Sequence, residues 1–174
     1  MTAAVHTLET DRLVLRGWRE SDFAPLAAFY ADDPESVFVG GPRRGGDVVM
    51  WFMARLGQWA LRGYGSFVIT ERASDAFAGW CGVNHYVGMR EPSIQWALAA
   101  PYRGKGYMTE AGRAALDFVF RASGRGLLMT TIHPANTASQ KTARRLNGAP
   151  DGTTVVDDDE TVDVWWFSPV GGQT

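Results

Sequence analysis

Residues 93 to 122 read SIQWALAAPYRGKGYMTEAGRAALDFVFRA, and their hydrophobic period changes in the middle. In the first part Ile94, Trp96 and Leu98 alternate with smaller or polar residues, which is the period-2 pattern of a strand with one buried face. Farther along, apolar residues recur about every 3.6 positions, as in an amphipathic helix. The members of this helical stripe are Met108, Ala111, Ala115, Phe118, Val119 and Ala122. We therefore predict a strand that leads through a short turn directly into a helix.

The turn between these elements holds two glycines and two cations, in the order Arg103-Gly104-Lys105-Gly106-Tyr107. Glycine has no Cβ, so backbone N–H groups here can close around an anion, and a helix that follows adds its positive N-terminal end. The turn is not a P-loop, because Gly106 stands where Ser or Thr should follow the lysine, and Thr109 fills the third site of the dinucleotide motif. It is a phosphate cradle or, as the alternative, only a tight connection.

Length and composition favour one globular domain. With 174 residues, 45% of them hydrophobic, the chain can bury a sizeable core, and we expect one domain over residues 1–174 with its core at about 7–168. A net charge of −2 gives no electrostatic support for a nucleic acid or an anionic membrane as partner. The chain shows neither a basic leader followed by an apolar run nor an 18-residue apolar stretch, so we expect a cytoplasmic protein.

Cysteine and acidic residues offer little for a metal. Cys81 is the single cysteine, which excludes an internal disulfide, and its apolar strand neighbours favour core packing over a nucleophilic role. Four adjacent acids, Asp157 to Glu160, lack the alternating spacing of a calcium loop. We predict a solvated turn at that position and no metal cofactor.

The whole chain gives an alternation of strands and helices that is typical of an α/β fold with a mixed sheet of about seven strands flanked by about four helices. Between the first two helices, the glycine-rich stretch Val37–Gly46 either borders a binding site or is a plain connector. The second helix is apolar on more than one face, so it is deeply buried or lends a face to a ligand or a partner subunit. The predicted elements are strands at 7–18, 66–71, 77–86, 93–100, 127–133, 153–156 and 161–167, and helices at 22–31, 48–61, 108–122 and from 136 or 137 to about 147.

Several motifs in this order resemble the GNAT acyltransferase superfamily. Arg103-Gly104-Lys105-Gly106 is similar to its Gln/Arg-x-x-Gly-x-Gly/Ala loop, and His133-Pro134-Ala135-Asn136-Thr137-Ala138-Ser139 is similar to the His-Pro-x-Asn-x-x-Ser stretch of the RimJ/RimL-like branch of ribosomal-protein N-terminal acetyltransferases. The segments LETDRLVLR at 8–16, WALRGYG at 59–65 and RGKGYMTEA at 103–111 also resemble that branch. The resemblance spans nearly the whole chain and implies the GNAT fold.

The resemblance also implies acetyl-CoA as cosubstrate. The strand backbone at Trp96 to Leu98 would pair with the pantetheine arm, and the turn that follows would hold the pyrophosphate through backbone N–H groups. Asn136 would hydrogen-bond the pantetheine arm, with Ser139 one helical turn later. Lys141 or Arg145 would meet the ribose phosphate, unless they form a solvated helix face. The cofactor-binding residues expected on this basis are Trp96, Ala97, Leu98, Arg103, Gly104, Lys105, Gly106, Tyr107, Met108, Asn136 and Ser139.

Two positions depart from the family pattern. Ser93 stands where many relatives place a catalytic Glu, and Ala143 stands where they place a Tyr that protonates the leaving thiolate. Nearby substitutes are Glu91, His85 and His133 as bases and Ser139 as a donor on the thiol side. Each of these also has an ordinary structural explanation, such as a surface carboxylate or a strand-end histidine, and much of the rate could come from positioning alone.

From these features we expect an N-acetyltransferase that moves an acetyl group from acetyl-CoA to a primary amine by direct attack in a ternary complex. A protein N-terminus and a small molecule, such as an aminoglycoside, a polyamine or an amino-acid analogue, are both open as acceptors. The departures at Ser93 and Ala143 motivate an alternative, a non-catalytic CoA-binding sensor or dimeric interaction module. A homodimer stays open, and a nucleotide-binding protein is a third hypothesis.

Overall fold

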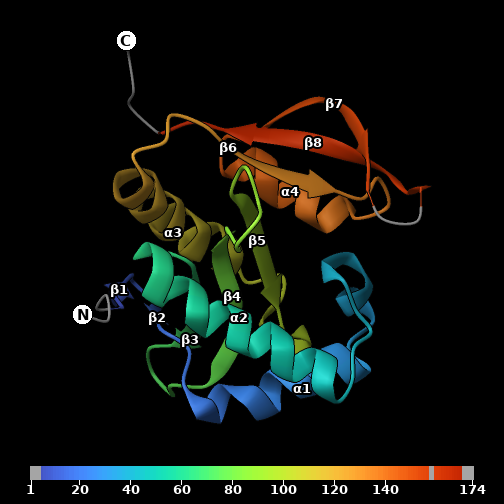
Figure 1. Cartoon of the computed structure of the whole chain (residues 1–174). Helices are drawn as coiled ribbons and strands as arrows, with labels where there is room; N and C mark the ends of the chain where they lie inside the picture. The colour runs from blue at the N-terminus through green and yellow to red at the C-terminus, as the bar shows by residue number, and fades with distance from the viewer. Residues whose placement is uncertain (1–4, 157–158, 170–174) are drawn as a thin grey trace.

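The computed structural model describes residues 5–156 and 159–169, and its centre is an eight-stranded mixed sheet in the order β1-β2-β3-β4-β5-β6-β8-β7 (Figure 1). The strands are β1 (Leu8–Glu9), β2 (Leu13–Arg16), β3 (Ser66–Glu71), β4 (Phe77–Asn84), β5 (Ser93–Leu98), β6 (Leu128–Ile132), β7 (Ala149–Val155) and β8 (Thr161–Phe167). The helices are α1 (Phe23–Asp32), α2 (Gly46–Arg62), α3 (Tyr107–Ser123) and α4 (Thr137–Arg145), with short 3₁₀ helices η1 (Glu20–Asp22), η2 (Pro34–Val39) and η3 (Ala100–Tyr102).

The two faces of the sheet bury separate hydrophobic clusters. Trp18, Val68 and Trp80 pack with side chains of α1 and of the first half of α2. On the other face of the sheet, side chains such as Phe67 and Ile69 of β3 pack with α3. Because successive side chains of a strand point to opposite faces, the alternation along β2 to β5 forms both clusters at once. Cys81 is buried in the α3 cluster, which confirms core packing.

The strands β5 and β6 separate soon after they meet. They are the parallel neighbours of the sheet, and their register consists of one pair, Ser93 with Met129, whereas β4 and β5 pair at six positions from Gly79–Leu98 to Asn84–Ser93. Thr130 Oγ1 donates to the carbonyl of Ile94 at 2.7 Å, so that carbonyl faces β6. Figure 1 shows β5 and β6 running in different directions from the place where they meet. The edge of β5 beyond Ile94 therefore lies open toward a gap.

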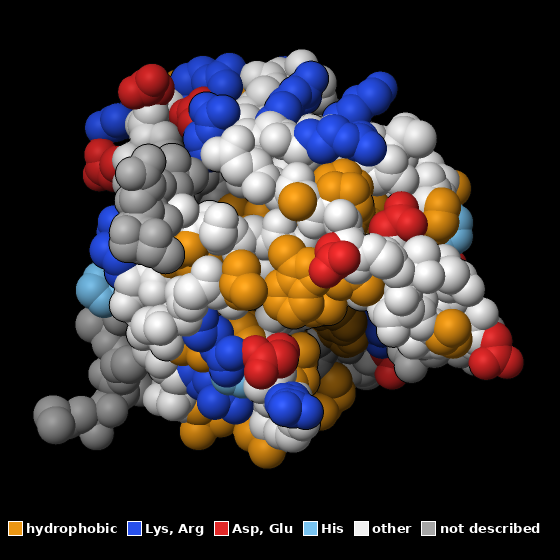
Figure 2. Space-filling view, turned by 90° about the horizontal axis from the view of Figure 1, so that it is seen from above, with side chains coloured by type: hydrophobic (Ala, Val, Ile, Leu, Met, Phe, Trp, Pro, Cys, Tyr) orange, Lys and Arg blue, Asp and Glu red, His pale blue; other side chains and the backbone are white. Residues whose placement is uncertain are grey.

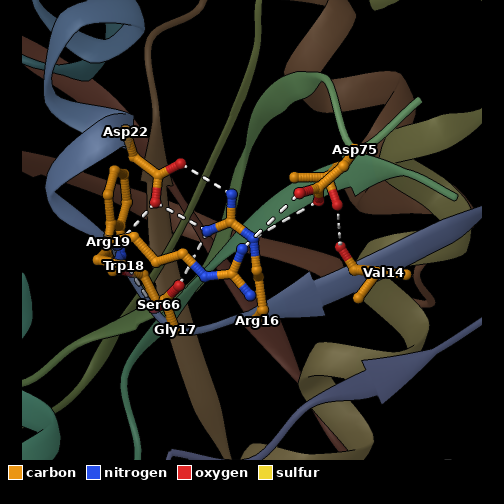
Figure 3. A network of polar contacts seen from close by, with 9 residues as sticks. Val14, Arg16, Gly17, Trp18, Arg19, Asp22, Ser66 and Asp75 are labelled. Atoms are coloured by element: carbon orange, nitrogen blue, oxygen red, sulfur yellow. Dashed lines mark hydrogen bonds and ion pairs between the residues drawn. The ribbon is translucent and has the colours of Figure 1, made fainter.

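A buried ion pair anchors the chain at the start of α1 (Figure 3). Arg16 at the end of β2 binds both carboxylate oxygens of Asp22, at 2.8 and 2.9 Å, and Asp22 also accepts the backbone N–H of Arg19 at 2.7 Å. The hydrogen bond to Asp22, which outweighs the opposing effect of burial, raises the pKa of Arg16. Paired in this way, both charges tolerate burial, and they hold α1 against the sheet.

Most of the expected elements are confirmed, with three corrections. The strand expected at 7–18 is a pair, β1 and β2, because Thr10 accepts and donates hydrogen bonds with Leu13 and closes a turn; this gives eight strands rather than about seven. The first part of the glycine-rich connection is helical, as η2. The strand β7 begins at Ala149, earlier than predicted, through a bulge between Pro150 and Thr153. Two acids of the predicted solvated turn, Asp157 and Asp158, lie outside the described residues.

The surface mixes charges of both signs. Figure 2, seen from above, shows Lys and Arg side chains interspersed with Asp and Glu, and hydrophobic side chains gathered around a hollow. Among the residues at 5–156 and 159–169, no group of three His, Cys, Asp or Glu side chains is placed to hold a metal ion. In the same part of the chain, no helix is long and apolar enough to cross a membrane.

Candidate active site

The glycine turn ends at the N-terminus of α3. Gly104 and Gly106 adopt positive φ angles of 75° and 77°, and Gly106 is the residue before the helix. The first hydrogen bond of the helix runs from the N–H of Glu110 to the carbonyl of Gly106, at 3.1 Å. The N–H groups of Tyr107 and the two residues after it therefore have no partner within the helix, as at any helix start. Together with the helix dipole they can bind a phosphate.

Side chains from β1 and β2 hold this turn in place. Arg12 donates to the carboxylate of Glu110 at 2.7 Å and to the carbonyl of Lys105 at 2.9 Å, while Thr10 Oγ1 donates to Glu110 at 2.6 Å. Burial alone would raise the pKa of Glu110, but the hydrogen bonds from Thr10 and Arg12 hold it below its usual range. The first-turn carboxylate is therefore neutralised by Arg12, and the free N–H groups of the helix stay available for an anion.

The side chain of Arg103 forms its hydrogen bonds within the protein. Its Nε donates to the carbonyl of Leu98 at 2.9 Å, and its Nη2 donates to Asp33 at 2.6 Å. Asp33 in turn accepts the N–H of Glu35 at the start of η2. Arg103 thus links the end of β5 to η2 and fixes the turn relative to the opposite wall of the gap.

A cavity of about 220 Å³, here called the first cavity, lies between the turn, the open edge of β5 and α4. It brings together most of the residues predicted to bind the cofactor. Lys105 is not among its lining residues; its ammonium lies over the rings of Tyr102 and Tyr107, at 5.4 and 5.7 Å from their centroids. The predicted residues that line the first cavity are Trp96, Ala97, Leu98, Arg103, Gly104, Gly106, Tyr107, Met108, Asn136 and Ser139.

Asn136 and Ser139 meet at the N-terminus of α4. Asn136 is 9% exposed and accepts the N–H of Ser139 at 3.0 Å as the helix cap, which leaves its amide NH₂ group for a ligand. Trp96 Nε1 donates to Ser139 Oγ at 3.2 Å across the gap between β5 and α4. Because the hydroxyl accepts from the indole, its own proton is free to be donated. Of the two cations considered for the ribose phosphate, Arg145 lines the first cavity and Lys141 does not.

A second cavity, of about 720 Å³, opens on the other side of Trp96. The two cavities share the residues Phe38, Val39, Trp96, Asn136 and Ser139. The second cavity is bounded by the loop before α2, by α2 itself, by β5 and by β6. The residues that line only this cavity include Arg43, Trp51, Ser93, Gln95, Thr131, His133 and Glu160. Two ligands, one bound in each cavity, would therefore meet at Trp96.

The sequence-based candidates for a base lie in different places. Glu91 is an exposed carboxylate paired with Arg125, and it lines neither cavity. His85 is buried with Nδ1 at 2.7 Å from the Tyr64 hydroxyl and also lines neither cavity; burial and then the nearby cations lower its pKa. His133 does line the second cavity, at the end of β6.

Both ring nitrogens of His133 are engaged. Nδ1 accepts the N–H of Ala135 at 3.0 Å, which places the proton of the neutral ring on Nε2, 3.1 Å from Glu160. The imidazole thus orients the Glu160 carboxylate at the wall of the second cavity. Ala143, where relatives carry a tyrosine, is fully buried in the α3 cluster and faces neither cavity.

Sequence reasoning missed three charged residues of the site. Glu35 lines the first cavity from η2, and Arg43 and Glu160 line the second. Arg43 lies in the glycine-rich stretch that we considered as the border of a binding site. Glu35 and Glu160 lie in short polar segments without hydrophobic periodicity, and nothing in their sequence context distinguishes them from surface carboxylates.

Comparisons with known proteins agree with this geometry. The model of the acetyltransferase (GNAT) domain family matches residues 12–148. An acetyltransferase from Agrobacterium tumefaciens str. C58 superposes with a TM-score of 0.87 at 30% identity, covering 95% of this chain and 96% of that one.

Two more distant relatives extend the similarity. The uncharacterized protein YkkB of Bacillus subtilis (strain 168) is 28% identical over 144 residues, which are 80% of this chain and 83% of that protein. Mycobacterium smegmatis RimJ, in complex with CoA-disulfide, shares the fold with a TM-score of 0.74 at 20% identity, covering 98% of this chain and 89% of that one. The chain belongs to the GNAT acetyltransferase family and, as the resemblance predicted, is an acetyl-CoA-dependent N-acetyltransferase.

Proposed function

We propose that this protein transfers the acetyl group of acetyl-CoA to a primary amine by direct attack within a ternary complex. The observation that carries the proposal is the meeting of two cavities at Trp96, one lined by the glycine turn and the other by the loop before α2 and by β6. A thioester that enters from the first cavity and an amine that enters from the second can touch without an acyl-enzyme intermediate. Holding the two reactants in this geometry is itself a large contribution to the rate.

The residues of the first cavity suit a long anionic cosubstrate. The backbone groups of Trp96 and Leu98 point to the same side as the Ile94 carbonyl, because strand backbone groups alternate in direction. The Leu98 carbonyl is taken by Arg103, and the remaining groups on this open edge can pair with amides of the pantetheine arm, like an added strand. The N–H groups at the start of α3 would hold the pyrophosphate, and the free amide of Asn136 would bind the arm. RimJ, which shares this fold, was solved with CoA-disulfide bound.

The chemistry requires one proton to leave the amine and one to reach the thiolate. As the new C–N bond forms and the C–S bond breaks, the ammonium proton passes to a base, and we assign this role to Glu160, directly or through water. His133 positions this carboxylate. Ser139 Oγ–H, freed by the Trp96 hydrogen bond, donates a hydrogen bond to the departing thiolate, which takes its proton from water, while Glu160 returns the amine's proton to water. This assignment replaces Glu91 as the candidate base, since Glu91 lies outside both cavities.

Two measurements on the purified full-length chain test the proposal. Calorimetry with CoA and with acetyl-CoA measures binding, and release of free thiol from acetyl-CoA across a panel of primary amines measures turnover. We expect micromolar binding and thiol release that saturates with the amine concentration. Failure to bind acetyl-CoA would sink the proposal. Tight binding without turnover on any amine would instead support the non-catalytic CoA-binding module that the substitutions at Ser93 and Ala143 motivate.

A further inference from the structure

Two guanidinium groups flank the ring of Trp51 at the edge of the second cavity. Arg43 lies 4.6 Å and Arg55 4.5 Å from the ring centroid. Arg55 also lies over the rings of Trp18 and Trp80, at 5.4 and 5.5 Å. Aromatic faces attract a cation, but they carry no net charge, so they do not neutralise two positive groups.

Arg55 is a buried cation without a counter-charge. It is 1% exposed, its Nη1 donates to the carbonyl of Trp51 at 3.1 Å, and its Nε and Nη2 find no hydrogen-bond partner among the described residues. No carboxylate of residues 5–156 or 159–169 forms an ion pair with it. Burial raises the pKa of the neighbouring Tyr30 phenol by more than Arg55 and Arg43 lower it, so Tyr30 stays neutral and supplies no negative charge. Since a guanidinium does not lose its proton, the charge remains and is costly to bury unpaired.

Arg43 carries the same excess of positive charge to the cavity wall. Its backbone N–H donates to the carbonyl of Tyr30 at 3.2 Å, which fixes the loop before α2, and its side chain lines the second cavity beside Trp51. Its Nε is buried and also lacks a partner among the described residues. A fixed guanidinium with an unused donor, backed by a second buried cation, is an incomplete site for an anion.

The strand side of the same cavity has the opposite character. Gln95 on β5 lines it with an Oε1 atom that is buried and accepts no hydrogen bond within the described part of the chain. The Glu160 carboxylate, held by His133, faces the cavity from the β6 side. Hydrogen-bond acceptors therefore line the cavity from the β5 and β6 side, and the positive charge lines it from the loop before α2, on Arg43.

From this polarity we infer that the acceptor is a small primary amine that also carries an oxyanion, a carboxylate or a phosphate-type group, and that Arg43 binds this oxyanion. The planar guanidinium can hold either group through two parallel hydrogen bonds. Polyamines and aminoglycosides are disfavoured, because their additional ammonium groups would face Arg43 and Arg55. The requirement for a primary amine in the ligand rests on the proposed acetyl transfer, whereas the requirement for an oxyanion rests on the charges of the cavity.

The experiment compares matched amines on the full-length protein. Amino acids and aminoalkyl phosphonates are tested against the corresponding carboxamides, against diamines such as putrescine, and against short peptides with free N-termini. Calorimetry, with and without CoA, measures acceptor binding, and thiol release from acetyl-CoA measures KM and kcat. We expect the best oxyanion-bearing amine to bind at least about tenfold more tightly than its carboxamide, since hydrogen bonds to charged groups are worth this much.

Four variants locate the effect. Arg43→Gln should raise the Kd and KM of oxyanion-bearing amines by about 10- to 100-fold and leave those of the carboxamides unchanged. Arg43→Glu should reverse the preference toward diamines. Arg44→Gln is the matched control, because Arg44 is the exposed neighbour and lines neither cavity. If Arg43→Gln proves unstable, Arg43→Lys keeps the charge and should lose less than tenfold.

The outcomes separate this inference from the proposed function. Equal binding of carboxamides and oxyanion-bearing amines, equal weakening of both by Arg43→Gln, or binding of peptides alone would each overturn the inference. A carboxylate and a phosphonate are distinguished by which series binds more tightly, and either result supports it. Absence of thiol release with every amine counts against the proposed transfer, whereas the calorimetric preference decides the inference independently.

Discussion

Trp96 on β5 and Ser139 on α4 are joined by a hydrogen bond of 3.2 Å from indole to hydroxyl, and this contact crosses the boundary between the two cavities. Since the hydroxyl accepts from the indole, its proton points elsewhere, and the departing sulfur is its proposed acceptor.

Ser139→Ala should lower kcat by about 10- to 100-fold, at the lower end of what a positioned hydrogen-bond donor contributes. Its effect on the Kd for acetyl-CoA should be small, because Asn136 and the turn would still hold the cosubstrate. Steady-state kinetics and calorimetry check the two parts separately. Ser139→Cys restores a donor and should recover part of kcat; an alanine variant with unchanged kcat would show that the hydroxyl does not stabilise the departing thiolate.

Gly104→Val should weaken acetyl-CoA binding by at least about tenfold. Gly104 has a φ of 75°, so a side chain strains the turn that presents the backbone donors. Gly124→Val is the matched control, because Gly124 ends α3 with a φ of 66°, has no atom within 4 Å of its Cβ position and lines neither cavity. Calorimetry on both variants, with thermal melting as a check of folding, distinguishes them. Equal affinity in both would place the pyrophosphate elsewhere.

Glu160→Gln should reduce kcat/KM by about 100-fold near pH 7, as expected for loss of a general base. The deficit should shrink toward pH 9.5, because an alkyl ammonium with a pKa near 10 then loses its proton to solvent more often. His133→Gln should cause a smaller loss of the same form, since His133 only orients the carboxylate.

The control variant for these kinetics is Glu9→Gln. Glu9 lies on β1 and is an exposed carboxylate paired with Arg72. Profiles of kcat/KM from pH 7 to 9.5 are measured for the original protein and for the Glu160→Gln, His133→Gln and Glu9→Gln variants, and they show whether the loss depends on pH. A parallel, pH-independent loss in Glu160→Gln would point to a binding role instead of proton transfer.

Stability should fall as the solution is acidified through the range of His85. Burial lowers the pKa of His85 in the folded protein, while in the unfolded chain it stays near the ordinary value of about 6.5. Between these two pKa values the unfolded state binds more protons than the folded state. The contribution of His85 to the free energy of unfolding is therefore fully present above about pH 6.5 and decreases as the pH falls below that value. Thermal melting from pH 8 to pH 5 measures the slope.

His85→Asn should flatten this dependence, because asparagine does not titrate and can still bond to Tyr64. His6→Gln serves as its control, since His6 is exposed near the N-terminus. If the slope of His85→Asn equals that of the original protein, other groups account for the acid sensitivity.

The central strand, turn and helix follow from local sequence. Alternation in β5, the glycines of the turn and the helical stripe of α3 each reflect short-range geometry, so all three elements appear where the pattern places them. The same holds for Asn136, which caps α4 by accepting the backbone N–H of Ser139, only three positions later in the chain. Most of the residues that line the first cavity could be named from the sequence because they belong to these contiguous motifs.

The second cavity depended on contacts between segments far apart in sequence. Glu91 is near β5 in the chain, yet Arg125 after α3 binds it outside both cavities; Glu160 is distant in the chain, yet the hairpin of β7 and β8 brings it to His133. Hydrophobic periodicity reports which face of an element is buried, and it carries no information about which loops meet across a gap. The sequence by itself therefore determined the family, the fold and the glycine turn before α3, whereas only the tertiary structure decided which charges line the second cavity, because those charges lie on loops positioned by long-range packing.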